Sequence, residues 1–148
     1  MKYGISMGLG IILWGTMLVA EGLQTQEMPI SELIKQNRQI VKLASEEISK
    51  TLPQKVDNYT VLQKVIGKDT TLNYVFEINT GAKSDETVKH EDRTRMQKAV
   101  TKGICRSSKR FLDAEINITY LYKSAVSKAV LFQFDVSKDD CMKSTYNQ

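Results

Sequence analysis

The sequence predicts an α+β domain in which an antiparallel four-stranded sheet carries its helices on one face, in the order α-β-β-α-β-β. Three observations support this prediction. Two segments place apolar residues at helical spacing, and four segments are typical of strands, three of them with apolar and polar residues in alternation. Two cysteines in the second half of the chain can also form one disulfide.

Two long helices are expected. The first begins with Ser31 as its N-cap and is ended by Pro53. The second opens at Ser84 with an acidic first turn, takes Gly103 as its C-cap, and precedes a short helical turn within 106–114. The apolar stripe of the first helix consists of Leu33, Ile34, Ile40, Val41, Ala44 and Ile48.

Four strands are expected, three from the alternation of apolar and polar residues and the first from a strand-like segment that ends at the turn signal Gly67-Lys68-Asp69. Because most of their aromatic residues share one parity with isoleucine and valine, we expect these rings to pack in the core. The residues of the other parity form a semi-polar face that could serve a partner, and residues 138–148 form a polar tail. The strands are expected at 59–67, 72–78, 116–123 and 130–136, and the semi-polar face carries Asn73, Val75, Glu77, Asn117, Thr119, Leu121, Leu131 and Gln133.

The N-terminal segment predicts export. Lys2 precedes an uncharged block from Gly4 to Ala20, and the small residues Ala20 and Gly22 suit a cleavage site. We therefore divide the chain into a signal peptide, 1–22, and a single α+β domain, 23–148. A retained inner-membrane anchor is the alternative, and in both cases the domain lies outside the cytoplasm. The expected location is the periplasm or the extracellular medium.

Export changes how the two cysteines are interpreted. Cys105 and Cys141 can pair in an oxidising compartment, and one bridge between them would stabilise the fold by roughly 4 kcal/mol on a loop-entropy estimate. Neither cysteine lies in a local nucleophile pattern. We predict a structural disulfide.

The remaining composition argues against catalysis. His90 is the only histidine, so multi-histidine zinc sites are excluded, and no phosphate-binding glycine loop is present. Three carboxylate pairs are adjacent in sequence. The two on predicted helices are expected to point apart on solvated faces. The pair in the loop beside Cys141 lacks the further oxygen ligands, at fixed spacing, that a calcium loop needs. We expect no catalytic residue, no metal site and no cofactor. These carboxylate pairs are Glu46 with Glu47, Glu91 with Asp92, and Asp139 with Asp140.

The charge balance gives no indication of a nucleic-acid partner. The chain has 21 Lys and Arg against 17 Asp and Glu, a net charge of +4, with both signs interspersed. Two small basic clusters, at 98–102 and 106–110, are expected to be solvated surface rather than a basic stripe with interleaved aromatics.

Several segments resemble a known family. The chain looks like the beta-type (AspS-like) pilotins of bacterial type II secretion. The resemblance lies in Ile48–Pro53, in Tyr59–Leu62, in the strand at 72–78, and in a strand between the two cysteines that opens with Ile116-Asn117-Ile118-Thr119-Tyr120. The resemblance implies a small periplasmic α+β domain with one disulfide, which holds a helical segment of a secretin subunit in a groove and guides it to the outer membrane. Those pilotins are lipoproteins, and no cysteine lies near Ala20 here, so piloting by a lipid anchor is not carried over. No contact residue is transferred.

The expected function is that of an exported, non-enzymatic periplasmic protein-binding domain, resembling a secretion-system pilotin or accessory protein. Its partner would be another protein, either a secretin-like subunit or a toxin. The alternative is a periplasmic inhibitor or immunity protein against a toxin or lysozyme. A small hydrolase that uses Asp or Glu side chains is a third hypothesis. A membrane contact is expected only if the N-terminal segment is uncleaved.

Overall fold

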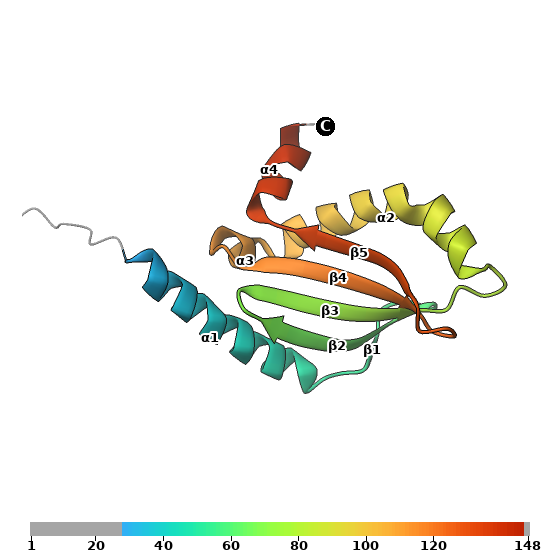
Figure 1. Ribbon diagram of the computed structural model, residues 1–148, viewed down its shortest axis with the longest axis horizontal. Coiled ribbons are helices and arrows are strands. Elements are labelled where there is room, and N and C mark those ends of the chain that lie inside the picture. Colours follow the sequence, from blue (N-terminus) through green and yellow to red (C-terminus); the bar gives the residue numbers. More distant parts are fainter. Residues whose placement is uncertain (1–27, 147–148) are drawn as a thin grey trace, which may run out of the picture.

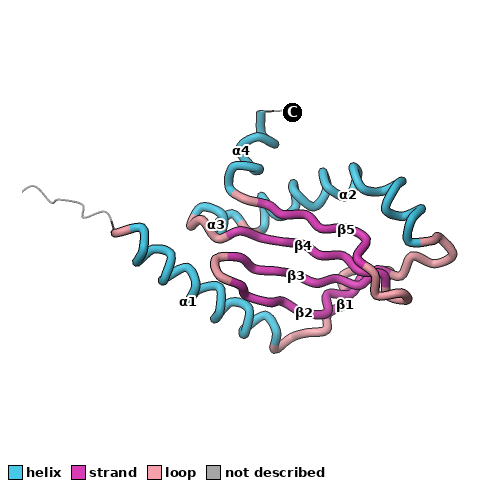
Figure 2. Tube along the Cα trace, in the orientation of Figure 1, coloured by secondary structure: helices cyan, strands magenta, loops and turns pink. Residues whose placement is uncertain are grey.

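The computed structural model describes residues 28–146, and the predicted signal peptide lies outside this part of the chain. Figures 1 and 2 show a twisted sheet with a long helix along each side and two short helices near one end. In chain order the elements are α1 (Ile30–Ser49), β1 (Gln54–Lys55), β2 (Thr60–Lys68), β3 (Thr71–Ile78), α2 (Asp85–Ser107), α3 (Lys109–Asp113), β4 (Asn117–Ser124), β5 (Val130–Val136) and α4 (Lys138–Tyr146).

The sheet has the spatial order β1-β2-β3-β4-β5. The α+β class and the order of the predicted elements are confirmed, but two details of the predicted sheet differ. The two-residue β1 adds a fifth strand, and β3 pairs with β4 in parallel, so the sheet is mixed. The parallel pair arises because α2 carries the chain back across the sheet, and β4 then runs in the same direction as β3.

Both long helices pack on the same face of the sheet, as predicted. On the α1 side, Gly67 of β2 lies directly against Val41 and Ser45. On the α2 side, Val100 and Ile104 join the core. Near one end of the strands, aligned residues of three strands are fully covered on this face: Leu72, Ile118 and Val136 are all buried and lie side by side in the register.

The opposite face of the sheet carries polar contacts. Thr119 donates a hydrogen bond to Asp135 over 2.7 Å, and Gln63 donates one to Glu77 over 3.1 Å. One residue expected here lies elsewhere: Leu131 is buried in the core. An irregularity in the β4–β5 register after Tyr122 shifts the alternation of β5 at this point, which explains the difference.

The ends of the helices differ in part from the prediction. Ser84 caps α2 as expected, because its side chain accepts a hydrogen bond from the Thr87 amide. In α1, by contrast, Pro29 occupies the N-cap position and Ser31 lies within the helix. The predicted polar tail is also helical, as α4. Asp140 accepts hydrogen bonds from the amide and hydroxyl of Ser137, just before this helix begins, at 2.9 and 2.6 Å.

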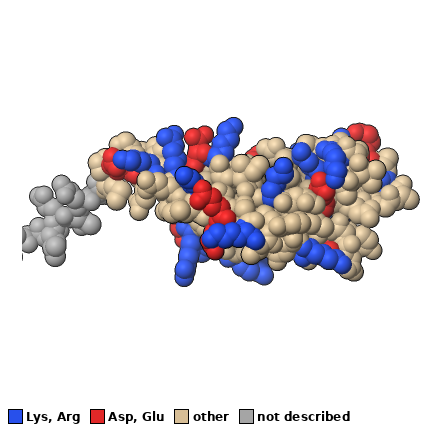
Figure 3. Space-filling view, turned by 90° about the horizontal axis from the view of Figure 1, so that it is seen from below, with Lys and Arg blue, Asp and Glu red and all other residues tan. Residues whose placement is uncertain are grey.

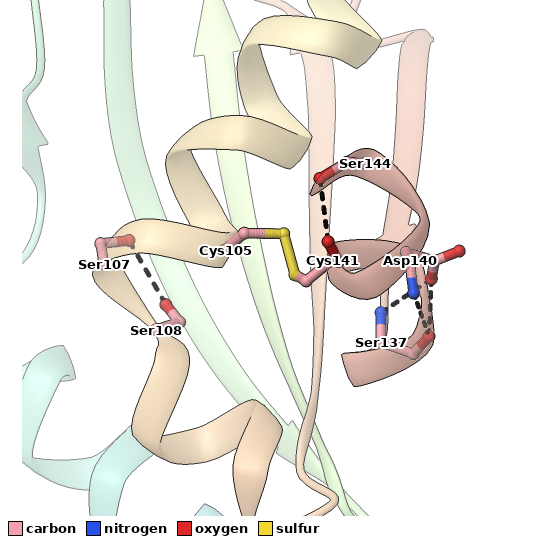
Figure 4. The surroundings of a disulfide bond; sticks show 7 residues. All are labelled: Cys105, Ser107, Ser108, Ser137, Asp140, Cys141 and Ser144. Carbon is pink, nitrogen blue, oxygen red and sulfur yellow. Dashed lines mark hydrogen bonds between the residues drawn. A yellow bond between two sulfur atoms is a disulfide. The ribbon is translucent and has the colours of Figure 1, made fainter. Parts of the chain in front are cut away.

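The predicted disulfide is present and joins two helices. Cys105 of α2 and Cys141 of α4 are 36 residues apart in sequence, and their Cα atoms are 5.5 Å apart. Figure 4 shows the bridge between the C-terminal turns of α2 and the first turns of α4. Among residues 138–144 of α4 none is fully buried, and Cys141 is the one that packs against the core, so the bridge is a principal attachment of this helix.

Candidate functional site

A groove of about 890 Å³ lies between α2 and the core face of the sheet. Its floor comes from β2, β3, β4 and β5, its wall from α2, and its mouth from the segment between β1 and β2. The groove exists because α1 packs mainly against β2, whereas α2 packs mainly against β5 at the other side of the sheet. The middle of the core face is therefore left partly uncovered.

The floor of the groove is a cluster of aromatic rings. Parallel pairing of β3 with β4 places Tyr74 beside Tyr120 and Phe76 beside Tyr122. The ring centroids are 5.2 Å apart in the first pair and 4.8 Å in the second. Phe76 and Tyr122 are buried, as predicted for core aromatics, but Tyr74 and Tyr120 are only partly buried. The floor thus presents aromatic surface that the domain itself does not cover.

The phenol groups of the floor are neutral hydrogen-bond donors at neutral pH. Burial raises the pKa of Tyr74 to about 12 and also raises the pKa values of Tyr120 and Tyr122, because desolvation disfavours the phenolate. Within residues 28–146, none of these hydroxyls forms a hydrogen bond with another side chain or with the backbone. In the same part of the chain, every fully buried side-chain oxygen has a hydrogen-bond partner, so an oxygen without one is not fully buried. The three hydroxyls are therefore accessible to solvent or to a bound molecule.

The wall of the groove contains a row of small residues on α2, Ala99, Gly103 and Ser107, which we call the small-residue row. These residues are four apart, lie on one side of the helix, and are all exposed. Around Gly103, a Cβ atom would meet nothing within 4 Å. The small-residue row therefore keeps the groove wide along α2.

Gly103 does not have the role predicted for it. We expected a C-cap, yet α2 continues to Ser107. The next residues explain the difference: Ile104 is buried in the core and Cys105 forms the disulfide, and both positions need the helix to continue. Sequence reasoning missed the small-residue row for this reason, although the spacing of four residues between Ala99, Gly103 and Ser107 was available as a signal.

The mouth of the groove is a turn stabilised by Asp57. Its carboxylate accepts hydrogen bonds from the amides of Tyr59 and Thr60, each at 2.8 Å. These bonds, the one from Tyr59 foremost, lower the pKa of Asp57. The turn displays two apolar side chains beside the groove, Val56 at 56% and Tyr59 at 68% exposure. The mouth therefore extends the apolar surface of the floor outwards.

The other residues considered from the sequence lie away from this groove or have structural partners. Glu91 forms an ion pair with Lys83, and Asp92, which lines the groove, forms one with Arg95. His90 lies on an exposed part of α2. Asp140 is held by Ser137, whose hydroxyl and amide lower the pKa of the carboxyl. The structure does not bring these groups together around one point.

The described residues hold neither a metal-binding cluster nor a membrane-spanning helix. Among residues 28–146, no three His, Cys, Asp or Glu side chains gather in a way that could hold a metal ion. In the same part of the chain, the helices are too short or too polar to cross a bilayer.

Three solved structures share this fold. A protein from Pseudomonas aeruginosa that is thought to be secreted matches with a TM-score of 0.65 and 10% identity, over 74% of this chain and 96% of its own. The pilotin EpsS of the Vibrio vulnificus type 2 secretion system matches with a TM-score of 0.60 and 13% identity, over 75% of this chain and 96% of its own. The type II secretion pilotin AspS of Vibrio cholerae matches with a TM-score of 0.59 and 16% identity, over 76% of this chain and 98% of its own.

The fold of the chain is therefore similar to that of type II secretion pilotins, as the resemblance in the sequence predicted. None of the curated proteins compared with the chain matches it. A family profile matches residues 35–132, more than half of the chain, and on this basis the protein belongs to the family described as a domain of unknown function, DUF8479.

Proposed function

We propose that this chain is an exported, non-enzymatic domain that holds an amphipathic helix of a partner protein in the groove beside α2. The observation that supports this function is the aromatic floor, where Tyr74 and Tyr120 remain partly exposed at the bottom of a groove of about 890 Å³. Exposed apolar surface in a concave site is typical of a surface that a partner covers. Pilotins share this fold, so the favoured partner is a secretin-like subunit.

The wall of the groove favours a helix over an extended peptide. Small residues four apart let a second helix approach α2 closely, because no large side chain keeps the two backbones apart. The residues of α2 that line the groove run from Val88 to Ser107. At 1.5 Å per residue this is about 28 Å, the length of a partner helix of about 19 residues.

The disulfide supports the compartment that we propose. A disulfide between Cys105 and Cys141 suits an oxidising environment. We propose that residues 1–22 are removed on export and that residues 23–148 work in the periplasm. Because no cysteine near Ala20 could carry a lipid, the proposed domain would bind its partner without a lipid anchor of the pilotin kind.

The experiment that tests this function fills the groove from its wall. Gly103→Trp puts a large side chain into the open space beside α2, whereas Gln97→Trp puts the same side chain on an exposed position of the same helix that does not line the groove. Binding is measured by fluorescence anisotropy with overlapping labelled peptides that together cover the secretin from the same organism. We expect one helical segment to bind the unaltered chain and Gln97→Trp equally, and to bind Gly103→Trp about a hundredfold more weakly.

Two results would contradict the proposal. Equal binding to Gly103→Trp and to the unaltered chain would show that the partner binds elsewhere. If no segment of the secretin binds the unaltered chain, the secretin-like partner is wrong. Circular dichroism of both variants establishes that they are folded before binding is compared.

A further inference from the structure

We propose that the helix held in the groove carries acidic residues along one flank, and that three cations of α2 recognise this flank. The inference rests on the proposed function and adds to it the chemistry of the partner. The cations are Lys98, Lys102 and Arg106, which we call the cation row.

The cation row belongs to an unusually one-sided stretch of sequence. From Arg93 to Leu112 the chain has seven Lys and Arg and no Asp or Glu. Two of these cations have carboxylate partners just outside the stretch, at 2.7 Å for Arg95 with Asp92 and 2.5 Å for Lys109 with Asp113. Within residues 28–146, the three members of the cation row form no ion pair and are exposed.

The surface around α1 provides a contrast. On the face seen in Figure 3, Lys and Arg are interspersed with Asp and Glu. Ion pairs along α1 join Lys42 with Glu46 and Lys50 with Glu47. The mixed surface predicted from the sequence is thus found at α1, whereas the second half of α2 keeps positive charge that the domain does not neutralise.

The helix geometry places the cation row at the edge of the groove. In the sequence, each residue of the cation row comes directly before one residue of the small-residue row. The buried residues Val100 and Ile104 come directly after Ala99 and Gly103. Consecutive residues of a helix point about 100° apart. The small-residue row therefore lies between the buried side of α2 and the cation row, so the cations border the groove on the side away from the sheet.

A bound helix would meet this arrangement with two different sides. Its apolar side would face the aromatic floor and the small-residue row, and the side next to it would pass along the cation row. The carboxylates that line the groove are already engaged, since Asp57 accepts two backbone amides and Asp92 pairs with Arg95. Acidic residues in the partner are therefore the complementary charge, and cations one helical turn apart suit acids spaced by four residues.

The test uses the full chain, expressed with its own N-terminal segment, and three labelled synthetic peptides of about 19 residues. All three have the same leucine-rich apolar side and differ only in the flanking positions, which are Glu, Gln or Lys. Anisotropy titrations are made at about 0.05 M and about 0.5 M salt. We expect the Glu peptide to bind about fivefold to tenfold more tightly than the Gln peptide, the Lys peptide to bind least, and the difference to shrink at high salt.

Charge reversal supplies the decisive comparison. In K102E/R106E the order of the peptides should invert, so that the Lys peptide binds most tightly. The matched control is K35E/K64E, which reverses two exposed lysines of α1 and β2 that form no ion pair within the described part of the chain. The control should keep the original order.

Each other outcome overturns the inference in a distinct way. Equal affinity for the three peptides, abolished for all by Gly103→Trp, would remove the charge recognition and leave the proposed function standing. If none of the three peptides binds although a secretin segment does, the inference fails and the proposed function stands; if neither kind of peptide binds, both fail. A preference for Glu that survives Gly103→Trp would place the acidic partner outside the groove. Binding of duplex DNA or anionic vesicles that K102E/R106E abolishes, without any peptide preference, would assign the cation row to another ligand.

Discussion

The two long helices cover the same face of one sheet, but they are attached to it differently, and two glycines show how. At Gly67, on β2, a Cβ atom would come within 2.9 Å of Val41 and of Ser45 on α1. At Gly103, on α2, a Cβ atom would meet nothing within 4 Å. The first glycine allows α1 to approach the sheet closely, and the second keeps space open beside α2.

This difference separates a structural part of the molecule from the candidate binding part. α1 is held by close packing at Gly67 and by the buried Asn37. α2 packs on the core through Val100 and Ile104 and is tied to the C-terminal helix by a covalent bond, but it leaves a groove at its side. If α2 forms one wall of a binding groove, its side chains cannot also fill the space between that wall and the sheet. The disulfide stabilises α2 without occupying the groove.

The largest expected effect comes from removing the disulfide. Replacement of both Cys105 and Cys141 by serine should lower the free energy of unfolding by about 4 kcal/mol, because a bridge across 36 residues restricts the unfolded chain. Denaturant titration measures this loss. Hydrogen exchange should show reduced protection in α4 and in the last turns of α2, with α1 little changed. Equal loss of protection in α1 would mean that the two helices are not attached independently.

A smaller loss is expected from Gly67→Ala. The added methyl group would meet Val41 and Ser45 at 2.9 Å and the carbonyl oxygen of Val41 at 3.0 Å. Since the backbone of α1 would have to shift, we expect a destabilisation of about 1–3 kcal/mol, measured from the midpoint of denaturation. Peptide binding in the groove should remain. An unchanged stability would show that α1 can move away from β2 at little cost.

Asn37→Ala tests the second attachment of α1. Asn37 is 3% exposed, and its Nδ2 donates a hydrogen bond over 2.6 Å to the carbonyl oxygen of Ala114, between α3 and β4. Removal of the donor leaves that carbonyl without its side-chain partner, so we expect a loss of about 1–2 kcal/mol in thermal or chemical denaturation. Asn37→Asp, which keeps the size but not the donor, should be at least as destabilising. Full stability in both variants would rule out a role for this bond.

The fold could be predicted from the sequence because periodicity is a local property. Alternation identified β3, β4 and β5, and a strand-like segment before a turn signal identified β2. Helical spacing identified both long helices, and Ser84 marked the start of α2. Strand direction is not encoded in alternation, which is why the parallel pairing of β3 with β4 was missed. α4 was missed because it has no apolar stripe and is attached by Cys141.

The candidate site was harder to predict than the fold. The aromatic rings were expected in the core, and only the packing of two helices at opposite sides of the sheet leaves Tyr74 and Tyr120 partly uncovered. The small-residue row was hidden by a local rule, since glycine at the end of an apolar pattern usually ends a helix. Burial of Ile104 and the bond at Cys105 override that rule in the folded chain.

The smallest predicted effect is a stabilisation, opposite in sign to the losses above, and it concerns Gly103 on α2. In the interior of a helix, glycine is less stable than alanine by about 0.5–1 kcal/mol, and nothing near Gly103 would oppose a methyl group. Gly103→Ala should therefore raise the free energy of unfolding by that amount, in contrast to Gly67→Ala. A methyl group narrows the groove only slightly, so peptide affinity should fall by less than about threefold, far less than for Gly103→Trp. If Gly103→Ala destabilises the domain, the space beside α2 is already filled in solution, and the difference between the two helices disappears.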